Sequence, residues 1–352
     1  MLIEKINSPA DVKKLSAKEL TALAEELRGR LIDVISKNGG HLSSNLGVVE
    51  LTVSLHFVFD SPDDRILWDV GHQSYVHKLL TGRRDQFDTL RQFGGLSGFP
   101  NPTESAHDAF VAGHSGNSIS AALGFAEEEA RKGSGRFTVA VVGDGSFTNG
   151  MIYEALNNCG NKSLRLIIVL NDNEMSIGRN VGGVSRHLSR LRSSGHYLKA
   201  KRWYREVMKK TAIGRAAYRV TRRLKNRLKR FLLPASLFEN MGFTYLGPVD
   251  GHDLPGLISL LTTAKGLGEP VVVHVVTKKG CGYRFAEEDP AKFHGIGAFD
   301  PETGKKLAKK ITSYSDSFGE AVMELAQKDD RICAITAAMP GGTGLLKFMR
   351  EY

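Results

Sequence analysis

Four runs of apolar residues, each ending in glycine or polar residues, constrain the fold of this chain more than any other feature. They read DRILWDVG (64–71), RFTVAVVGDG (136–145), RLIIVLNDN (165–173) and PVVVHVVTKKG (270–280). Runs of this length and composition are typical of buried strands. Helical patterns lie between them, for example over 117–132 and 150–160. Strands that alternate with helices predict an α/β fold in which a parallel sheet, joined by right-handed crossovers, is flanked by helices.

The rest of the chain divides into a main domain and a short C-terminal unit. A helix is predicted over 17–37, because Ser16 and Glu19 form a capping box. We predict that the main domain covers 1–295 and that the polar stretch 296–312 is a linker. Residues 313–352 read as a helix followed by a strand, the start of a truncated second α/β domain that is too short to bury a core of its own.

The basic residues are concentrated in one segment. The net charge is +10, yet 17 of the 48 Lys and Arg residues lie between Arg186 and Arg230, with Glu206 as the one acidic residue among them. The excursion 186–233 ends in a basic amphipathic helical pattern, which favours packing of its apolar stripe on its own domain. Contact with a membrane surface or an acidic partner is the alternative. Nucleic-acid binding is disfavoured, because the segment has no interleaved stacking aromatics and no groove-binding motif.

The cysteines and the N-terminus indicate a cytoplasmic protein. Cys159, Cys281 and Cys333 are scattered and have no metal-ligand spacing, as in a reduced compartment. We find no stretch that resembles a signal peptide and no apolar run long enough for a membrane span. Cys281 is expected to be an inert loop residue, because the neighbouring sequence offers it no His or Asp context.

Two of the predicted strands end in residues that suit a divalent cation. Asp144 lies between Gly143 and Gly145, and Asn173 ends the next predicted strand. The two glycines would let the backbone turn sharply and approach a ligand closely. Magnesium takes about six oxygen ligands, usually one or two carboxylates together with phosphate oxygens. The helix expected to begin near Thr148 would add backbone N–H donors for those phosphates.

A plain strand-to-helix crossover with Asp144 as the helix N-cap is the alternative interpretation of the Gly-Asp-Gly motif taken alone. The occurrence of Gly-Asp-Gly together with Asn173 favours a site for a metal ion and a diphosphate cofactor. Gly-Asp-Gly after one apolar strand, with Asn after the next, is the fingerprint of thiamine diphosphate enzymes, and both ends occur here in the predicted context.

Eight motifs in this order carry a family resemblance: GGHLSSNLGVVELTVSLHFVF, DRILWDVGHQSYVHKLLTGRRDQFDTLRQFGGLSGFP, AGHSGNSISAALG, GDGSFTNGMIYEALNN, VLNDNEMSIGRNVGG, LFENMGFTYLGPVDGHD, TKKGCGY and FHGIGAFDP. Together they resemble the 1-deoxy-D-xylulose-5-phosphate synthases, relatives of the transketolases. The resemblance covers nearly the whole chain. It corresponds to the family's N-terminal diphosphate-binding domain plus the first piece of its pyrimidine-binding domain. One departure is GHSGNS, which replaces the family's commoner Ser-Ser-Thr-Ser run after the histidine.

The resemblance implies a reaction and its cofactors. The family condenses pyruvate with D-glyceraldehyde 3-phosphate and releases CO₂, which feeds isoprenoid (terpenoid), thiamine and pyridoxal biosynthesis. It uses thiamine diphosphate and Mg²⁺, and the cofactor performs the difficult carbon chemistry. The expected partners are the two substrates and a second copy of the chain in a homodimer, or a complementing C-terminal polypeptide.

Carried over residue by residue, the resemblance implies three groups of site residues. The metal ligands are Asp144, Asn173 and the backbone carbonyl of Met175. The cofactor contacts are His72, Gly113, His114, Ser115, Gly145, Ser146, Asn173 and Tyr283. The catalytic histidines are His41, His72 and His294, since imidazole is suited to proton transfer near neutral pH.

The resemblance also implies what this chain does not contain. In the family, a glutamate of the pyrimidine-binding domain holds the aminopyrimidine ring, and its motif lies downstream of Tyr352. We therefore expect negligible synthase activity from this polypeptide alone. Two other functions stay open: the N-terminal subunit of a split transketolase, and a non-catalytic protein that binds thiamine diphosphate.

Overall fold

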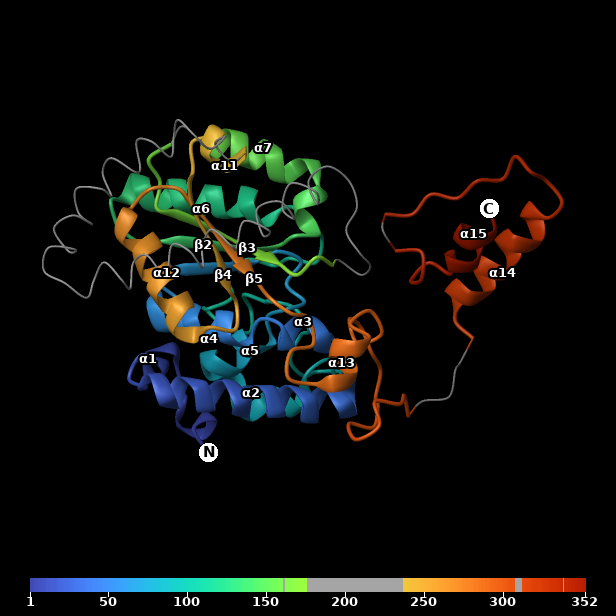
Figure 1. The fold of residues 1–352 in the computed structure, drawn as a ribbon, viewed down its shortest axis with the longest axis horizontal. Coiled ribbons are helices and arrows are strands. Elements are labelled where there is room, and N and C mark those ends of the chain that lie inside the picture. Colours follow the sequence, from blue (N-terminus) through green and yellow to red (C-terminus); the bar gives the residue numbers. More distant parts are fainter. Residues whose placement is uncertain (161, 176–236, 308–311, 338) are drawn as a thin grey trace, which may run out of the picture.

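A computed structural model describes residues 1–160, 162–175, 237–307, 312–337 and 339–352 (Figure 1). The predicted basic excursion 186–233 lies outside the described residues, and so do the interpretations attached to it. No helix in the described part of the chain is long and apolar enough to cross a bilayer.

The four predicted strands form one parallel sheet together with a fifth. In spatial order the strands are β1 Arg65–Trp68, β2 Thr138–Gly143, β3 Leu166–Asp172, β5 Val271–Val276 and β4 Thr244–Asp250. Every neighbouring pair is parallel. The predicted α/β fold with a parallel sheet is confirmed, and because all strands run the same way, their carboxyl ends share one edge of the sheet.

Alternate residues of the strands feed two separate cores, as the two-residue period of a strand requires. Ala140, Val142 and Ile168 point to one face, where helices α6 Ser118–Lys132, α7 Gly150–Cys159 and α11 Leu237–Asn240 cover them. Val139 and Val141 point to the other face, which α4 Val49–Val58 and α12 Leu254–Leu267 cover. Figure 1 shows the sheet between these two helical layers.

A third layer packs outside α4. Helix α2 Ala17–Asn38 begins at the predicted capping box, in which Ser16 Oγ accepts a hydrogen bond from the Glu19 amide. Its apolar stripe packs with Tyr75 and with Phe293 and Phe299 from the end of the domain. This layer adjoins His41 through Tyr75, whose hydroxyl lies 3.4 Å from His41 Nδ1.

The remaining helical elements are short, except α14 with 13 residues. They are η1 Ile3–Lys5, α1 Pro9–Val12, α3 Leu42–Leu46, α5 Tyr75–Lys78, η2 Leu79–Arg83, η3 Arg84–Thr89, η4 Ser146–Thr148, α13 Arg284–Glu288, α14 Tyr314–Ala326 and α15 Leu346–Glu351.

Two details of secondary structure differ from the sequence analysis. Strand β4 was not predicted, because Gly247 and Pro248 interrupt its apolar pattern; proline is tolerated there because β4 is an edge strand, and its register shifts between Leu246 and Val249. The strand predicted after α14 does not form in the described residues, since 332–337 have no neighbouring strand with which to share backbone hydrogen bonds.

The division into domains remains a prediction. One observation concerns the predicted linker. Ile296 and Phe299, in the predicted linker 296–312, are buried in the core around α2. Gly40 and Ile296 also form an isolated antiparallel bridge. The start of this stretch thus packs on the main domain. In the C-terminal unit, Ala326, Leu345 and Phe348 form a separate small cluster.

A buried network of ionisable side chains braces α5, and the ring of its His77 lies 5.8 Å from that of Trp68 in β1. Asp108 accepts hydrogen bonds from His77 Nε2 at 2.9 Å and from Arg83 Nη1 at 2.6 Å, and it also lies 3.7 Å from the Lys78 ammonium. Burial alone would raise the pKa of Asp108, but the hydrogen bonds from His77 and Arg83 hold it well below its usual range. The Asp108 carboxylate also accepts a hydrogen bond from the Asn101 amide, so the network ties α5 to the following loop.

Replacing Asp108 with Ala should lower the free energy of unfolding by about 3–5 kcal/mol, because it leaves buried cations without their counter-charge. Urea denaturation followed by tryptophan fluorescence measures this loss. The matched control is Asp63→Ala, which removes the exposed ion pair between Asp63 and Arg136 and should cost about 1 kcal/mol or less. Similar small losses for both variants would show that the buried network does not stabilise the fold.

Candidate active site

Three predicted catalytic histidines, far apart in sequence, meet in one cluster. His41 precedes α3, His72 follows β1, and His294 follows α13. The ring centroids of His41 and His72 are 5.3 Å apart, those of His41 and His294 5.6 Å, and those of His72 and His294 5.1 Å. Phe99 adds an aromatic edge 5.9 Å from the His41 centroid. A compact group of imidazoles is thus available to one bound molecule.

Asn45 holds two of these histidines in place, and the sequence analysis missed it. Its Nδ2 donates to the backbone carbonyl of His41 at 2.6 Å and to that of His72 at 2.8 Å. Its Oδ1 accepts a hydrogen bond from the Tyr75 amide at 2.9 Å. His294 is held separately, by a 3.2 Å hydrogen bond between Nδ1 and the Ser44 hydroxyl. One fully buried amide therefore fixes the distance between two loops.

All three imidazoles are neutral near pH 7. Burial lowers the pKa of His41 to about 4, with help from the Arg91 charge, and lowers that of His294 to about 3, with help from Lys279. Burial also holds the pKa of His72 well below its usual range. A neutral imidazole has one nitrogen that donates and one that accepts, so each ring can take up or pass on a proton.

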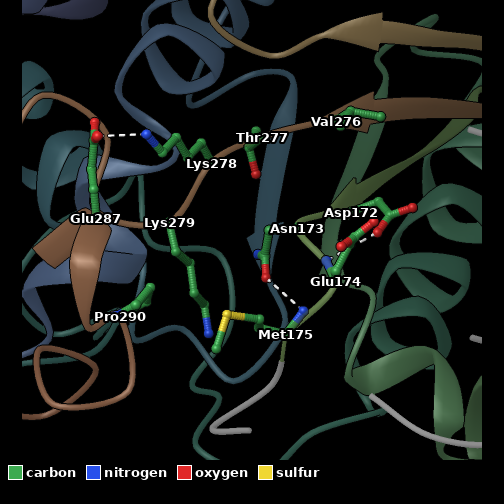
Figure 2. A pocket seen from close by; sticks show the side chains of 10 residues that line it. All are labelled: Asp172, Asn173, Glu174, Met175, Val276, Thr277, Lys278, Lys279, Glu287 and Pro290. Atoms are coloured by element: carbon green, nitrogen blue, oxygen red, sulfur yellow. Dashed lines mark hydrogen bonds and ion pairs between the residues drawn. The ribbon is translucent and has the colours of Figure 1, made fainter. Parts of the chain in front are cut away.

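Asp144 and Asn173, two of the predicted metal ligands, lie next to each other at the carboxyl edge of the sheet. β2 pairs with β3 so that Gly143 lies opposite Asn171, and the Asp144 amide donates to the Asn171 carbonyl at 3.0 Å. The backbone amide of Asn173 hydrogen-bonds the Asp144 carboxylate. The Asn173 side-chain oxygen accepts a hydrogen bond from the Met175 amide at 3.2 Å, which turns the chain at this point (Figure 2).

Asp144 is buried beside a second carboxylate. Burial, and then the nearby charge of Asp172, raise the pKa of Asp144 to about 7. Lys279, buried at the same edge, lowers it in part, and burial lowers the pKa of Lys279 itself to about 8. A cation placed beside Asp144 would favour its ionised form, so these surroundings suit a positively charged ligand.

The turn after β2 leaves room for a ligand. Gly145 and Ser146 begin the 3₁₀ turn η4, and α7 follows with Asn149 as its N-cap. Gly145 has an ordinary φ of −61°, so the turn does not need a left-handed conformation at this glycine. A Cβ added to Gly143 would meet no atom of the described residues within 4 Å. The space beside this glycine is therefore open on the side of the described residues.

The predicted contacts Gly113, His114 and Ser115 lie on an exposed loop that two unpredicted residues anchor. The Asp69 carboxylate accepts hydrogen bonds from the Gly116 amide at 3.0 Å and from the Ser118 hydroxyl at 2.6 Å. Asn149 Nδ2 donates to the Ser115 carbonyl at 3.0 Å. Because Asp69 follows β1 and Asn149 caps α7, this loop is tied to the same sheet edge as Asp144 and Asn173.

A pocket of about 220 Å³ opens beside this edge (Figure 2). Residues 172–175 line one side and 276–279 the other, with Glu287 and Pro290 completing the wall. Figure 2 shows the Lys279 side chain reaching toward Met175. The pocket therefore includes the predicted ligands Asn173 and Met175.

Tyr283, a predicted cofactor contact, uses its side chain for packing and hydrogen bonding within the fold. Its ring packs against Phe285, Phe293 and Phe299, and its hydroxyl donates to the Pro301 carbonyl at 2.8 Å. The side chain is used inside the fold, so its contact with a cofactor stays a prediction without geometric support.

Known proteins match this chain closely. A family model described as 1-deoxy-D-xylulose-5-phosphate synthase matches residues 3–277. The chain belongs to this family. The synthase of Pelotomaculum thermopropionicum is 54% identical over 352 residues, which are 100% of this chain and 55% of that protein. Synthase 1 of Geobacter sulfurreducens is 51% identical over 354 residues, 100% of this chain and 56% of that protein. The chain thus spans about half the length of these synthases.

Solved transketolases share the fold. Transketolase from Leishmania mexicana superimposes with a TM-score of 0.57 at 18% identity, over 88% of this chain and 48% of that one. The Campylobacter jejuni enzyme gives 0.57 at 21% identity, over 82% of this chain and 44% of that one. The matches to the synthases confirm the family resemblance read from the motifs, and the solved transketolases agree with the predicted fold class.

The imidazoles of His41 and His294 should remain neutral at pH values well below that at which an ordinary histidine becomes protonated. A histidine in an unfolded chain titrates near pH 6.5, whereas His41 and His294 should titrate near 4 and 3. Since the unfolded chain takes up protons first, their contribution to stability is complete above about pH 6.5 and is lost as the pH falls toward 4. NMR titration of the ring ε1 protons, assigned with His41→Gln and His294→Gln, measures these values; midpoints near 6.5 would contradict the burial argument.

Proposed function

We propose that the described residues hold the magnesium and diphosphate part of a thiamine diphosphate site. The observation that carries the proposal is the meeting of Asp144 and Asn173 at one sheet edge, beside the pocket that contains Asn173 and Met175. The membership of the chain in the synthase family supports the same reading.

The residues present fit the metal. Magnesium is bound through few carboxylates and keeps substrate phosphate oxygens or waters. One carboxylate from Asp144, one amide oxygen from Asn173 and the Met175 carbonyl are such a set. Among the described residues, no group of three or more His, Cys, Asp or Glu side chains is arranged so that it could hold a metal ion by itself.

The residues around the metal ligands have separate roles in this proposal. The backbone at Gly145 and Ser146, with the loop of Gly113, His114 and Ser115, binds the diphosphate. His41, His72 and His294 face the reacting end and exchange protons with substrate. When bound, thiamine diphosphate supplies a carbon nucleophile and an electron sink. The protein's own contribution is to hold the cofactor, exclude water and place neutral imidazoles.

The reaction proposed for the whole protein is that of 1-deoxy-D-xylulose-5-phosphate synthase. It joins pyruvate to D-glyceraldehyde 3-phosphate with release of CO₂, in a homodimer or together with a complementing C-terminal polypeptide. The second candidate is a transketolase half that accepts ketose phosphates; the transketolase fold favours it, and the 54% identity to a synthase disfavours it.

Asp144→Asn should weaken binding of thiamine diphosphate in the presence of Mg²⁺ by at least about 100-fold, because it removes the one carboxylate ligand. Isothermal titration calorimetry measures this affinity. Removing Mg²⁺ with excess EDTA should likewise abolish binding of thiamine diphosphate to the unchanged chain. The control is Glu302→Gln on the exposed turn after Pro301, which should bind normally. Equal affinity with and without Mg²⁺ would sink the metal assignment.

The reaction is tested with the purified chain, alone and mixed with the remaining C-terminal portion of the Pelotomaculum synthase. We expect CO₂ release from pyruvate and D-glyceraldehyde 3-phosphate only in the mixture, and none in a mixture that contains Asp144→Asn. Losing positioned proton-transfer groups costs about 10²–10⁴ in rate, so the chain alone should be near background. Ketol transfer from xylulose 5-phosphate without use of pyruvate would favour the transketolase alternative.

A further inference from the structure

A chain of hydrogen bonds between side chains crosses three neighbouring strands and ends at the carboxyl edge of the sheet. Tyr245 Oη in β4 lies 2.6 Å from His274 Nδ1 in β5. His274 Nε2 lies 3.0 Å from Oδ2 of Asp172, the last residue of β3. His274 and Asp172 are fully buried. The edge strand β4 is thus connected, through one imidazole, to the carboxylate that precedes the predicted ligand Asn173.

The donors and acceptors in this chain run in one direction. A carboxylate only accepts hydrogen bonds, so His274 Nε2 carries the proton that faces Asp172. Burial, with the nearby Asp172 charge, raises the pKa of Tyr245 to about 13, so its hydroxyl stays protonated. A neutral imidazole has one donor and one acceptor. Both are used here, because Nδ1 accepts from the Tyr245 hydroxyl and Nε2–H donates to Asp172.

Asp172 uses its other oxygen to hold a strained turn. Oδ1 accepts a hydrogen bond from the Glu174 amide at 3.3 Å (Figure 2). Glu174 has a φ of 66°, in the left-handed region that residues other than glycine seldom adopt. Such a conformation costs about 1–3 kcal/mol and persists only where the surroundings enforce it. The Asp172 carboxylate is one of the groups that enforce it.

Backbone pairing fixes the chain only up to this turn. The last register pair of β3 and β5 joins Asp172 to Val276, and the Thr277 amide donates to the Asp172 carbonyl at 2.9 Å. Thr277 Oγ1 also donates to Asn171 Oδ1 at 2.6 Å. Beyond Asp172 the chain leaves the sheet. The turn that follows therefore depends on side-chain hydrogen bonds for its shape.

The strained residue lies between two predicted metal ligands. Asn173 precedes Glu174 and Met175 follows it, and the Met175 amide donates to Asn173 Oδ1 at 3.2 Å. A change of φ at Glu174 would swing the Met175 carbonyl away from its present direction and leave Asn173 in place. The conformation of Glu174 thus sets how the two predicted ligands are oriented relative to each other.

We propose that the side chains of Tyr245, His274 and Asp172 position the metal site. They hold Glu174 in its left-handed conformation, so that the predicted ligands on either side of it present their oxygens to one cation. Residues that orient metal ligands typically contribute about 10- to 100-fold to metal affinity. The identity of the cation rests on the proposed function, whereas the effect on the turn does not.

Three variants separate the hydrogen bonds of this chain. Tyr245→Phe removes the hydroxyl and keeps the ring, which stacks on Phe238 with centroids 5.8 Å apart. In His274→Gln, the amide nitrogen takes the place of Nε2 and can still donate to Asp172. In His274→Asn, the shorter amide reaches only as far as Nδ1, so the bond to Asp172 is lost.

The matched control removes another buried hydroxyl. Thr52 is fully buried, and its Oγ1 donates to the Val48 carbonyl at 2.7 Å, a bond that stays next to its own helix α4. Thr52→Val should therefore leave the turn unchanged. Urea denaturation of all four variants reports their stability.

Amide hydrogen exchange tests the turn without metal or cofactor. A hydrogen bond is typically worth a factor of about 2 to 12 in an equilibrium. NMR should show exchange of the Glu174 amide at least about threefold faster in Tyr245→Phe and about tenfold faster in His274→Asn, with His274→Gln close to the unchanged chain. Amides of β2 should keep their rates in every variant. If His274→Asn does not fold, Tyr245→Phe decides, since it keeps the packing of the ring.

Metal selectivity separates positioning from loss of stability. Mg²⁺ requires near-octahedral geometry at short distances, whereas Ca²⁺ tolerates longer and more variable ones. With thiamine diphosphate in excess, calorimetric titration should show affinity for Mg²⁺ at least about tenfold lower in His274→Asn, and a clearly smaller loss for Ca²⁺. His274→Gln and Thr52→Val should retain the affinities of the unchanged chain.

The two measurements decide separate claims. If the unchanged chain binds neither metal, the proposed function fails, and the exchange rate of the Glu174 amide alone decides the role of the three side chains. Equal losses for Mg²⁺ and Ca²⁺ would overturn the positioning role. So would a Glu174 exchange rate in Tyr245→Phe and His274→Asn no faster than in Thr52→Val.

Discussion

The parallel pairing of β2 with β3 determines where this chain can carry out chemistry. Because Gly143 lies opposite Asn171, the residues that follow each strand, Asp144 and Asn173, leave the sheet at the same edge and touch there. β5 pairs with β3 on the other side and brings Thr277 and Lys279 to that edge. A slip of one residue in either pairing would turn these side chains to the opposite face. The sheet thus sets the relative positions of the proposed metal ligands Asp144 and Asn173 before any loop contributes.

The loops around this edge depend on buried polar residues that touch no expected ligand. Asn45 holds two histidine loops together, and Asp69 holds the Gly116 turn. Both side chains are fully or nearly fully buried, so each lost hydrogen bond would leave a donor or acceptor unsatisfied, which costs about 1–3 kcal/mol. Such residues act on the site by fixing distances, and their replacement would move the histidines without changing their chemistry.

Much of the fold and part of the site could be predicted from sequence, and the limits have physical causes. The four buried strands were visible because each is a continuous apolar run, whereas β4 was hidden by Gly247 and Pro248, which an edge strand tolerates. Asp144 and Asn173 could be proposed as ligands from the sequence because strand ends mark binding positions in parallel sheets, and their role stays a prediction. Asn45 and Asp69 were missed because their partners are backbone groups, which leave no pattern in the sequence.

The histidines themselves show which part of the molecule is free to bind something. His77, His252 and His274 each face a carboxylate, from Asp108, Glu50 and Asp172 respectively. In the cluster, His41 and His294 have hydroxyl partners, from Tyr75 and Ser44, and His72 Nδ1 has no hydrogen bond among the described residues. His107, which pairs with the Ser61 hydroxyl, and His56, which pairs with His77, also lack a carboxylate, but they do not lie together with two other such rings. A carboxylate fixes a ring's tautomer and charge, but it also occupies a nitrogen. Three part-buried imidazoles that lack a carboxylate keep ring nitrogens available, and a ligand could supply partners for them.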